Sequence, residues 1–379
     1  MTVFQTSGLE AEKVLVETLH LSEPIPFPSG LAFHPIRKSL FVTSRDQDQR
    51  WIYEVEPQTG QVRKWKSGGS IYSPPNSCSQ NSLIVSCSRV QSTPEDIPSI
   101  TIDSQGYIYL SFSYSNLGLF SLIEGNKSQV QQIKLISPDS FENPIIGVFP
   151  SNDQSKFKDE ALKFKGIKAI TLDHQGNIFL IDGGNSLIRK IMNNFVYNVA
   201  GNQTLGYGAD GQASQVSFGE PFGITLNQTG DIFITDRLLS NVRKISIDGQ
   251  VSTFAGSQTL DNLTGFKDGK GTSARFKRLT SIILDQANNL YVSDTDNQAI
   301  RKITPEGVVS TLAGQPSPMP TKIHATPLPY NPSLIDGPGT DARFHSPIGL
   351  ALDDQGVLYV ADRGNHAIRR IKPIGEQKK

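Results

Sequence analysis

Hydrophobic and polar positions alternate with a period of two along most of the chain, in short runs separated by turn residues. Near the C-terminus, "IGLALD" (348–353) and "VLYVAD" (357–362) flank "DQG" (354–356), a sequence typical of a tight turn. After a short polar link, "HAIRRI" (366–371) alternates again. The pattern predicts a β-hairpin followed by a third antiparallel strand.

This unit recurs along the chain. The segment "LYVADRGNHAIRRI" (358–371) has counterparts at 290–303, 232–245 and 178–191, and three of the copies are followed or preceded by a further strand-like run such as "VVSTLAG" (308–314). Two weaker copies cover 30–66 and 99–136. Repetition at this period indicates an array of identical supersecondary units. The sequence therefore predicts six four-stranded antiparallel meanders.

Six such sheets bury their apolar faces by standing radially around an axis, as in a β-propeller. The sixth copy lacks a fourth strand, whereas "EKVLVETLHL" (12–21) precedes the first copy. We predict that this N-terminal strand completes the last blade. The fold class expected is an all-β, six-bladed β-propeller forming one domain over residues 1–379, with blades near 26–66, 97–136, 166–201, 220–256, 278–314 and 347–372 plus 12–21.

The repeat resembles a known family. "DHQGNIFLIDGGNSLIRKI" (173–191) carries the motif Asp-x-x-Gly-Asn-(Ile/Leu)-(Tyr/Phe)-(Val/Ile)-x-Asp, then Asn, then Ile-Arg-Lys-Ile. This motif resembles the NHL-repeat six-bladed β-propellers, most strongly from about 162 to 372. Copies one and two depart from it, with Ser44 and Phe112 at the position of the final Asp. The resemblance implies the propeller fold.

Four aspartates at equivalent positions each precede an arginine by seven residues. A ring of carboxylates could hold a cation, but a carboxylate bonded to a guanidinium or to turn amides is the interpretation we prefer, because buried charges are normally paired. Asn185, Asn241, Asn297 and Asn365, with His366, are interpreted as turn formers. The predicted structural ladder comprises Asp182, Asp236, Asp294, Asp362, Arg189, Arg243, Arg301 and Arg369.

No metal site is predicted. The six histidines are scattered and lack the spacing of zinc ligands. By register, the residues just ahead of the inner strands are Ser29, Pro98, Lys168, Phe222, Thr280 and Ile348. This set contains almost none of the oxygen ligands that calcium takes. We expect no cofactor, with calcium as the alternative.

Three Gly-rich loops, "GADGQAS", "KDGKGTSA" and "DGPGTDA", lack the patterns of a phosphate-binding loop or an EF-hand. Each precedes a phenylalanine: Phe218, Phe276 and Phe344. The prediction is a shaped turn whose phenylalanine fills the space between blades.

Three long insertions, at 67–96, 137–161 and 313–339, join an outer strand to the next inner strand. They are therefore expected on the same face as the Asp-Asn links, over the central channel. Long loops on rigid scaffolds often carry function, and aromatic residues on loops often anchor partners. The predicted ligand or partner contacts are Tyr72, Phe141, Phe149, Lys168, His324 and Tyr330.

Charge and composition limit the partners. Thirty-six basic and 36 acidic residues give a formal net charge of zero, which argues against nucleic-acid or membrane partners. Neither an 18-residue apolar stretch nor a signal-peptide pattern is present, so a soluble, cytoplasmic monomer is expected, with secretion as the alternative. Cys78 and Cys87 allow one disulfide or two free thiols.

Two functions from different classes follow from the sequence. The first is a binding scaffold that holds a protein, a peptide or a small molecule on the loop-rich face. The second is a propeller lyase or metal-dependent hydrolase with a loop-built site on that face. Fold alone does not choose between them, because one architecture hosts many chemistries. We favour the scaffold, since the ligand sets of related enzymes do not map onto this chain.

Overall fold

The computed structural model shows that the alternating segments form β-strands. No α-helix occurs among the residues it describes, and the short 3-10 turns there include η4 (Gly183–Asn185), η5 (Gly271–Ser273), η6 (Thr295–Asn297), η7 (Gly339–Asp341) and η8 (Arg363–Asn365). The structure describes residues 14–46, 49–65, 99–104, 108–112, 132–136, 167–192, 195–258, 263–316 and 334–374.

The strands form six antiparallel sheets, numbered I to VI below. Sheet I contains β2 (Pro28–His34), β3 (Ser39–Asp46), β4 (Gln49–Val55) and β5 (Val62–Trp65). Sheet II contains β6 (Ile100–Ile102), β7 (Ile108–Phe112) and β8 (Gln132–Ile136). Sheet III contains β9 (Ile167–Leu172), β10 (Ile178–Asp182), β11 (Leu187–Met192) and β12 (Phe195–Ala200).

The remaining three sheets each have five strands. Sheet IV contains β13 (Gly211–Gln212), β14 (Pro221–Leu226), β15 (Ile232–Asp236), β16 (Asn241–Ile245) and β17 (Gln250–Ala255). Sheet V contains β18 (Gly269–Lys270), β19 (Leu279–Leu284), β20 (Leu290–Asp294), β21 (Ala299–Ile303) and β22 (Val308–Gly314). Sheet VI contains β1 (Val14–Thr18), β23 (Gly337–Pro338), β24 (Pro347–Leu352), β25 (Leu358–Asp362) and β26 (Ala367–Pro373).

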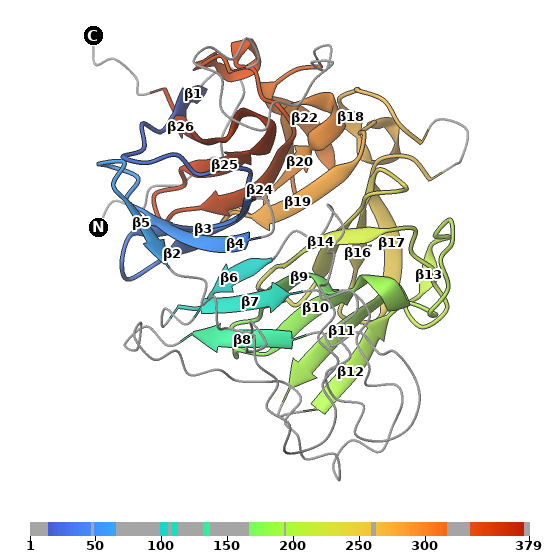
Figure 1. Ribbon diagram of the computed structural model, residues 1–379. Coiled ribbons are helices and arrows are strands. Elements are labelled where there is room, and N and C mark those ends of the chain that lie inside the picture. Colours follow the sequence, from blue (N-terminus) through green and yellow to red (C-terminus); the bar gives the residue numbers. More distant parts are fainter. Residues whose placement is uncertain are drawn as a thin grey trace, which may run out of the picture.

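The sheets stand side by side in a ring (Figure 1). Their inner strands contact one another in the closed order β2, β6, β9, β14, β19, β24 and back to β2. Six apolar clusters lie between neighbouring sheets, one at each junction of the ring. Burial of these side chains is the main stabilising contribution, at about 25 cal/mol per Å² of apolar surface. The predicted all-β propeller fold is confirmed.

The N-terminal strand lies where the sequence predicted it. β1 pairs with β26 from Val14–Pro373 to Thr18–Arg369, and Val14 and Val16 are fully buried. β1 thereby supplies the outer strand of sheet VI, which the end of the repeat array lacks (Figure 1).

Sheets IV, V and VI differ from the predicted four-stranded unit. In each, two residues of the preceding Gly-rich loop pair with the outer strand: β13 with β17, β18 with β22 and β23 with β1. The periodicity could not indicate a two-residue strand. These short additions cover part of an outer edge that would otherwise expose unpaired backbone groups.

Sheet II also departs from the prediction. The copy over 99–136 predicts four strands, in which 117–125 would be the third and 130–136 the fourth, yet β7 pairs directly with β8, for example Leu110 with Lys134. Segment 117–125 lies outside the described residues. Both "QIKLI" and "LGLFSLI" alternate, so the period alone does not distinguish the two candidates for the third strand.

Two glycines set how closely inner strands approach. A Cβ atom on Gly349 would lie 1.9 Å from the carbonyl oxygen of Ser29, and one on Gly223 would lie 2.3 Å from that of Thr280. Only glycine permits such contact between neighbouring backbones. The ring around the axis is therefore narrow, and its wall is rigid at these points.

Candidate functional site

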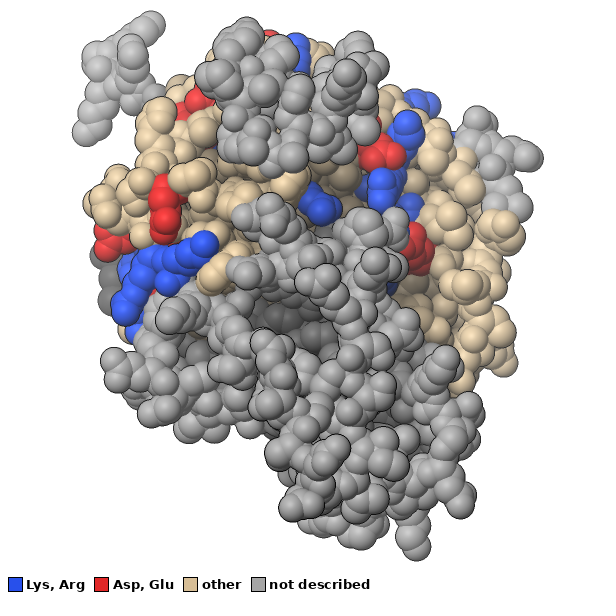
Figure 2. Space-filling model, in the orientation of Figure 1, with Lys and Arg blue, Asp and Glu red and all other residues tan. Residues whose placement is uncertain are grey.

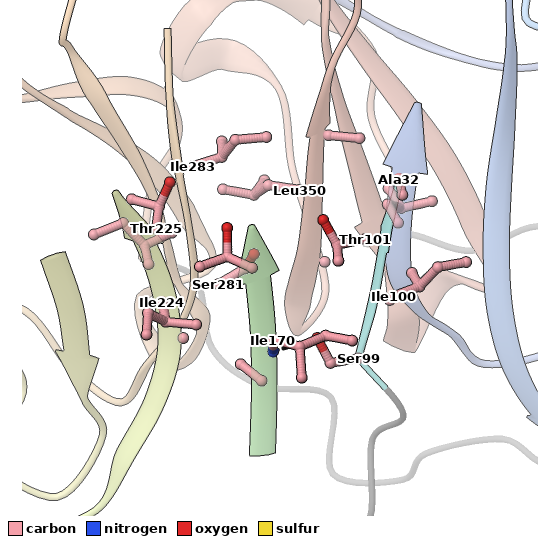
Figure 3. A pocket seen from close by; sticks show the side chains of 18 of the residues that line it. Ala32, Ser99, Ile100, Thr101, Ile170, Ile224, Thr225, Ser281, Ile283 and Leu350 are labelled. Atoms are coloured by element: carbon pink, nitrogen blue, oxygen red, sulfur yellow. Dashed lines mark hydrogen bonds between the residues drawn. The ribbon is translucent and has the colours of Figure 1, made fainter. Parts of the chain in front are cut away.

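The inner strands enclose a cavity of about 290 Å³ on the axis of the ring (Figure 3). All six of them contribute to its lining. Because each strand runs along the axis, residues at the same position of different strands form one layer. In five of the strands the second residue, towards the predicted loop face, lines the cavity: Ser29, Lys168, Phe222, Thr280 and Ile348.

Five of the six residues predicted at the channel mouth lie in this layer, within the inner strands rather than just ahead of them. The sixth, Pro98, lies outside the described residues, and Ser99 lines the cavity just ahead of β6. Ile100 pairs with Leu110 as Ile170 pairs with Leu180, so Ser99 aligns with Ala169 and not with Lys168.

Lys168 is the one charged side chain among the described residues that line the cavity. It lies on β9 and is half-buried. Within the described part of the chain it has neither an ion pair nor a side-chain hydrogen bond. Of the six predicted contact residues, it is the one that the structure places at the channel.

The other five predicted contacts lie outside the described residues. They are Tyr72, Phe141, Phe149, His324 and Tyr330. Their proposed contact with a ligand stays a prediction.

The hydroxyl groups of the channel wall fall into two classes. Those of Ser29, Ser99 and Thr280 hold the wall together: Ser29 Oγ donates to the Thr43 carbonyl, Ser99 Oγ accepts from the Ile170 amide, and Thr280 Oγ1 bonds Thr295 Oγ1. Those of Thr101, Thr225 and Ser281 project into the space between the strands and bond no described protein group (Figure 3). The hydroxyl of Thr171, which also lines the cavity, bonds no described group either. The second class is available to a ligand.

The aspartate ladder consists of buried ion pairs in three sheets. Asp182 and Arg189 are 3.0 Å apart, Asp294 and Arg301 2.8 Å, and Asp362 and Arg369 2.9 Å. All six side chains are at most 3% exposed. Each pair fixes the link between the second and third strands of its sheet, as the spacing of seven residues predicted.

In sheet IV other donors satisfy the ladder aspartate. Asp236 accepts hydrogen bonds from the backbone amides of Gly219, Glu220 and Leu239, and Arg243 pairs with Asp210 instead. The direct pair expected from spacing is therefore absent here. Three amide donors satisfy the Asp236 carboxylate, and Arg243 keeps only the loop contact that Arg301 and Arg369 make in addition to their direct pairs.

Burial perturbs these carboxyl groups. It raises the pKa of Asp294 to about 6, although the charge of Arg301 and a hydrogen bond from Asn297 act in the opposite direction. Burial also raises the pKa of Asp236 and Asp362. In each case loss of hydration disfavours the ionised form. The shifts arise inside the sheets, away from the cavity lining.

The Gly-rich loops attach to the ladder arginines. Arg243, Arg301 and Arg369 each pair with a loop aspartate: Asp210, Asp268 and Asp336, respectively. Phe218, Phe276 and Phe344 lie under these guanidinium groups and are at most 1% exposed. Each belongs to a cluster shared by two neighbouring sheets. The prediction that these phenylalanines fill the space between blades is confirmed.

Three of the four predicted turn asparagines bond the ladder. Asn185, Asn297 and Asn365 each donate from Nδ2 to the aspartate three residues earlier. Asn241 does not belong to this set. It lies in β16 and donates to the Ser257 carbonyl, while Leu239 occupies the equivalent turn position. The motif of that copy is "DRLLSN", and its asparagine lies two residues beyond the turn position, so the prediction for Asn241 is wrong.

The last residue of each link has a role that the sequence analysis missed. Ser240, Gln298 and His366 adopt left-handed backbone, and their side chains accept a hydrogen bond from the next sheet. The donors are the amides of Arg278 at 3.1 Å, Ser346 at 2.7 Å and Phe27 at 3.3 Å. Each link therefore fastens its own sheet to the following one, and His366 does so across the ring closure.

No group of three or more His, Cys, Asp or Glu side chains with metal-binding geometry occurs among the described residues. On the face seen in Figure 2, the described basic and acidic side chains are interspersed. No helix in the described ranges is long and apolar enough to span a membrane.

Comparisons with known proteins agree with the repeat motif. The family model of the teneurin NHL domain matches residues 267–372. Teneurin-3 of Danio rerio is 30% identical over 221 residues, which cover 55% of this chain and 8% of teneurin-3. NHL repeat-containing protein 2 of Bos taurus is 32% identical over 165 residues, covering 41% of this chain and 21% of that protein. The chain thus matches only a small part of each relative.

Solved structures agree with the fold. A Bacteroides thetaiotaomicron protein of unknown function superimposes with a TM-score of 0.62 at 18% identity, covering 95% of this chain and 76% of the other. An auxiliary nutrient binding protein from the same organism gives 0.62 at 15% identity, covering 96% and 77%. A streptogramin B lyase gives 0.51 at 13% identity, covering 96% and 99%. At these identities the likeness concerns the fold alone.

Proposed function

The chain is an NHL-repeat β-propeller, and on this premise we propose that it acts as a rigid scaffold holding a ligand or partner on its loop-rich face, over the central channel. In this proposal the six sheets are the six blades of one propeller, which constitutes a single domain. The ligand is a protein, a peptide or a small molecule.

The proposal rests on one contrast: the links around the channel mouth are held by ion pairs and hydrogen bonds, whereas a polar group inside the mouth is unpaired among the described residues. Ion pairs and inter-sheet hydrogen bonds immobilise the links around the mouth. Lys168, inside that mouth, has no described partner of its own. A pre-organised surface with unused polar groups binds at a small entropic cost, which suits a scaffold.

The face can be mapped with selected peptides. Binders are taken from a random dodecapeptide display library and their affinities measured for the wild-type protein, for Arg278→Glu on the loop face and for Gln228→Glu in the turn between β14 and β15. Arg278 and Gln228 are both exposed in part. We expect Arg278→Glu to weaken most binders and Gln228→Glu to leave them unchanged. The opposite ranking would place the working face elsewhere.

A propeller lyase or metal-dependent hydrolase is the second proposal, because an active site assembled from loops requires little from the inner strands. Metal analysis of the purified protein separates the two. A stoichiometric calcium or zinc ion retained through gel filtration overturns the scaffold assignment, since calcium and zinc are the metals such enzymes use.

A further inference from the structure

The free polar groups of the central channel lie on four of its six inner strands. Lys168 lies on β9, and the unused hydroxyls of Thr101, Thr225 and Ser281 lie on β6, β14 and β19. These four strands are consecutive in the ring. All six inner strands, including β2 and β24, also contribute aliphatic side chains to the lining. A ligand in this channel therefore meets hydrogen-bond donors from four strands and aliphatic groups from all six.

The charge of the lining is unbalanced. Its described residues include one ammonium group and no carboxylate. At equivalent positions of neighbouring sheets, Lys190 pairs with Asp173 and Lys244 with Asp231, whereas the buried Lys302 has no ion pair among the described residues. Lys168 differs from Lys302 because it lines a cavity, where a ligand can reach it. A half-buried ammonium group without a protein partner favours an anion in the cavity.

The donors also fit an oxyanion. A lysine ammonium group and hydroxyl groups donate hydrogen bonds to the several acceptor lone pairs of a carboxylate or a phosphate, and a charged acceptor strengthens each bond. The three hydroxyls remain unused although other hydroxyls of the same wall bond the backbone. A cavity of about 290 Å³ limits the ligand to a small molecule or a single side chain.

We infer that the channel binds a small organic carboxylate, with its anionic group at Lys168 and the hydroxyls of Thr101, Thr225 and Ser281, and its short aliphatic part against β2 and β24. This inference rests on the proposed function, since it names the chemistry of a ligand at the same face. The carboxylate belongs to a free small acid or to an acidic side chain or terminus of a peptide.

Four probes of matched size test the inference at constant ionic strength. Butyrate, butanol, butylamine and inorganic phosphate are titrated into the full chain by isothermal calorimetry. Butyrate is expected to bind saturably, phosphate more weakly because it has no apolar part, and butanol and butylamine not measurably. Equal binding of butyrate and butanol, or no saturable butyrate binding, overturns the inference.

Variants locate the site. Lys168→Met keeps the aliphatic stem and is expected to weaken butyrate binding by at least about tenfold, the scale of one lost charged hydrogen bond. Lys267→Met removes the same charge at an exposed position outside the lining and is expected to bind as the wild type does. The pair Thr101→Val and Ser281→Ala should reduce affinity several-fold. Unchanged binding by Lys168→Met shows that any bound butyrate lies elsewhere.

Competition separates this inference from the proposed function. If the selected peptides bind the loop face and butyrate neither binds nor displaces them, the scaffold stands and the carboxylate site fails. If butyrate binds in a Lys168-dependent manner and no peptide maps to that face, the channel site stands and the scaffold fails. Displacement of acidic peptides by butyrate supports both and identifies the peptide carboxylate as the ligand group.

Discussion

Sheets V and VI follow one plan but obtain their outer strand from different parts of the chain. In sheet V the chain continues from β21 into β22, whereas in sheet VI the outer strand β1 comes from the N-terminal end. Thr311 of β22 donates from its amide and its hydroxyl to Asp268, and Thr18 of β1 donates in the same way to Asp336. The contacts of a strand are therefore set by its position in the sheet and not by its position in the chain.

In both sheets, the ladder arginine joins three elements. Arg301 bonds Asp294 and Asp268, and Arg369 bonds Asp362 and Asp336. Sheet VI adds ion pairs from Glu17 to Arg370 and Lys372, at 2.7 and 2.9 Å. The closing strand has no covalent connection to its neighbour, so these additional contacts hold it in register.

Removing the closing strand is the most disruptive test of the comparison. Deleting residues 1–22 leaves sheet VI without β1 and exposes Ile371, which Val14 and Val16 cover in the full chain. We expect loss of a cooperative urea transition, followed by circular dichroism. The matched control deletes residues 1–13, ahead of β1, and should unfold like the full chain. If the 1–22 deletion unfolds at the same urea concentration as the wild-type protein, the assignment of β1 as the strand that completes sheet VI is wrong.

The ladder variants come next in size. Asp294→Ala and Asp362→Ala each leave a buried guanidinium without one of its two carboxylates, and we expect each to lower the unfolding free energy by about 2 to 4 kcal/mol. Similar losses of unfolding free energy in the two sheets would show that the equivalent ion pairs contribute equally to stability. Wild-type melting with loss of a bound ligand would instead give the ladder a direct role in binding.

Thr18→Val and Thr311→Val test whether equivalent hydrogen bonds in the two sheets contribute equally to stability. Each removes one hydroxyl donor to a loop aspartate, while the backbone donor to the same carboxylate stays. The expected cost is about 1 kcal/mol in each sheet, the usual contribution of a single hydrogen bond. Chemical denaturation curves provide the measurement. A cost several times larger for Thr18 would mean that the closing strand detaches as a unit.

The smallest expected effect concerns acid. Burial alone would raise the pKa of Glu17 and Asp336, but for Glu17 hydrogen bonds from Lys372 and Arg370 outweigh it, and for Asp336 those from Thr18 together with the charge of Arg369 do. Both pKa values are lowered. Their stabilising contribution is therefore present above the unfolded-state pKa of about 4 and is lost as the pH falls through the folded-state value.

We accordingly expect the urea midpoint of Glu17→Gln to approach that of the wild type as the pH falls from about 5 to about 3, because the raised pKa values of Asp236, Asp294 and Asp362 act in the opposite direction equally in both proteins. The effect is small because Glu17 is largely solvated. Glu56→Gln, in an exposed turn of sheet I, serves as the control and should keep the wild-type slope. If the urea midpoints of both variants depend on pH in the same way, Glu17 does not contribute to the loss of stability in acid.

The repeat motif made much of this architecture predictable. Period-two alternation located the inner hairpins, the missing sixth outer strand located β1, and the seven-residue interval located three buried ion pairs. A further signal was overlooked: "VETL" (16–19) repeats "VSTL" (309–312), and aligning them places Thr18 on Thr311. That alignment predicts the register of β1 and its bond to the loop aspartate.

Other features could not be predicted from a single sequence. Arg243 lies seven residues after Asp236 like its counterparts, yet backbone amides satisfy Asp236 and the arginine pairs with the loop Asp210 alone among the described carboxylates. Competition between donors for one carboxylate is decided in three dimensions, and spacing does not record it. The same holds for the free hydroxyls of Thr101, Thr225 and Ser281, whose availability depends on what neighbouring strands bond.

The pairing of β1 with β26 has a mechanical consequence. Val14 opposes Pro373 at one end of the ladder and Thr18 opposes Arg369 at the other, so both chain ends leave from the same end of the pair. We expect a pulling force applied between the segments that flank this ladder to act first on Val14 and Pro373 and to break the ladder one bond after another. The propeller is therefore expected to open under tension by unzipping, at a lower force than strands loaded in shear withstand, with loss of the outer strand from sheet VI.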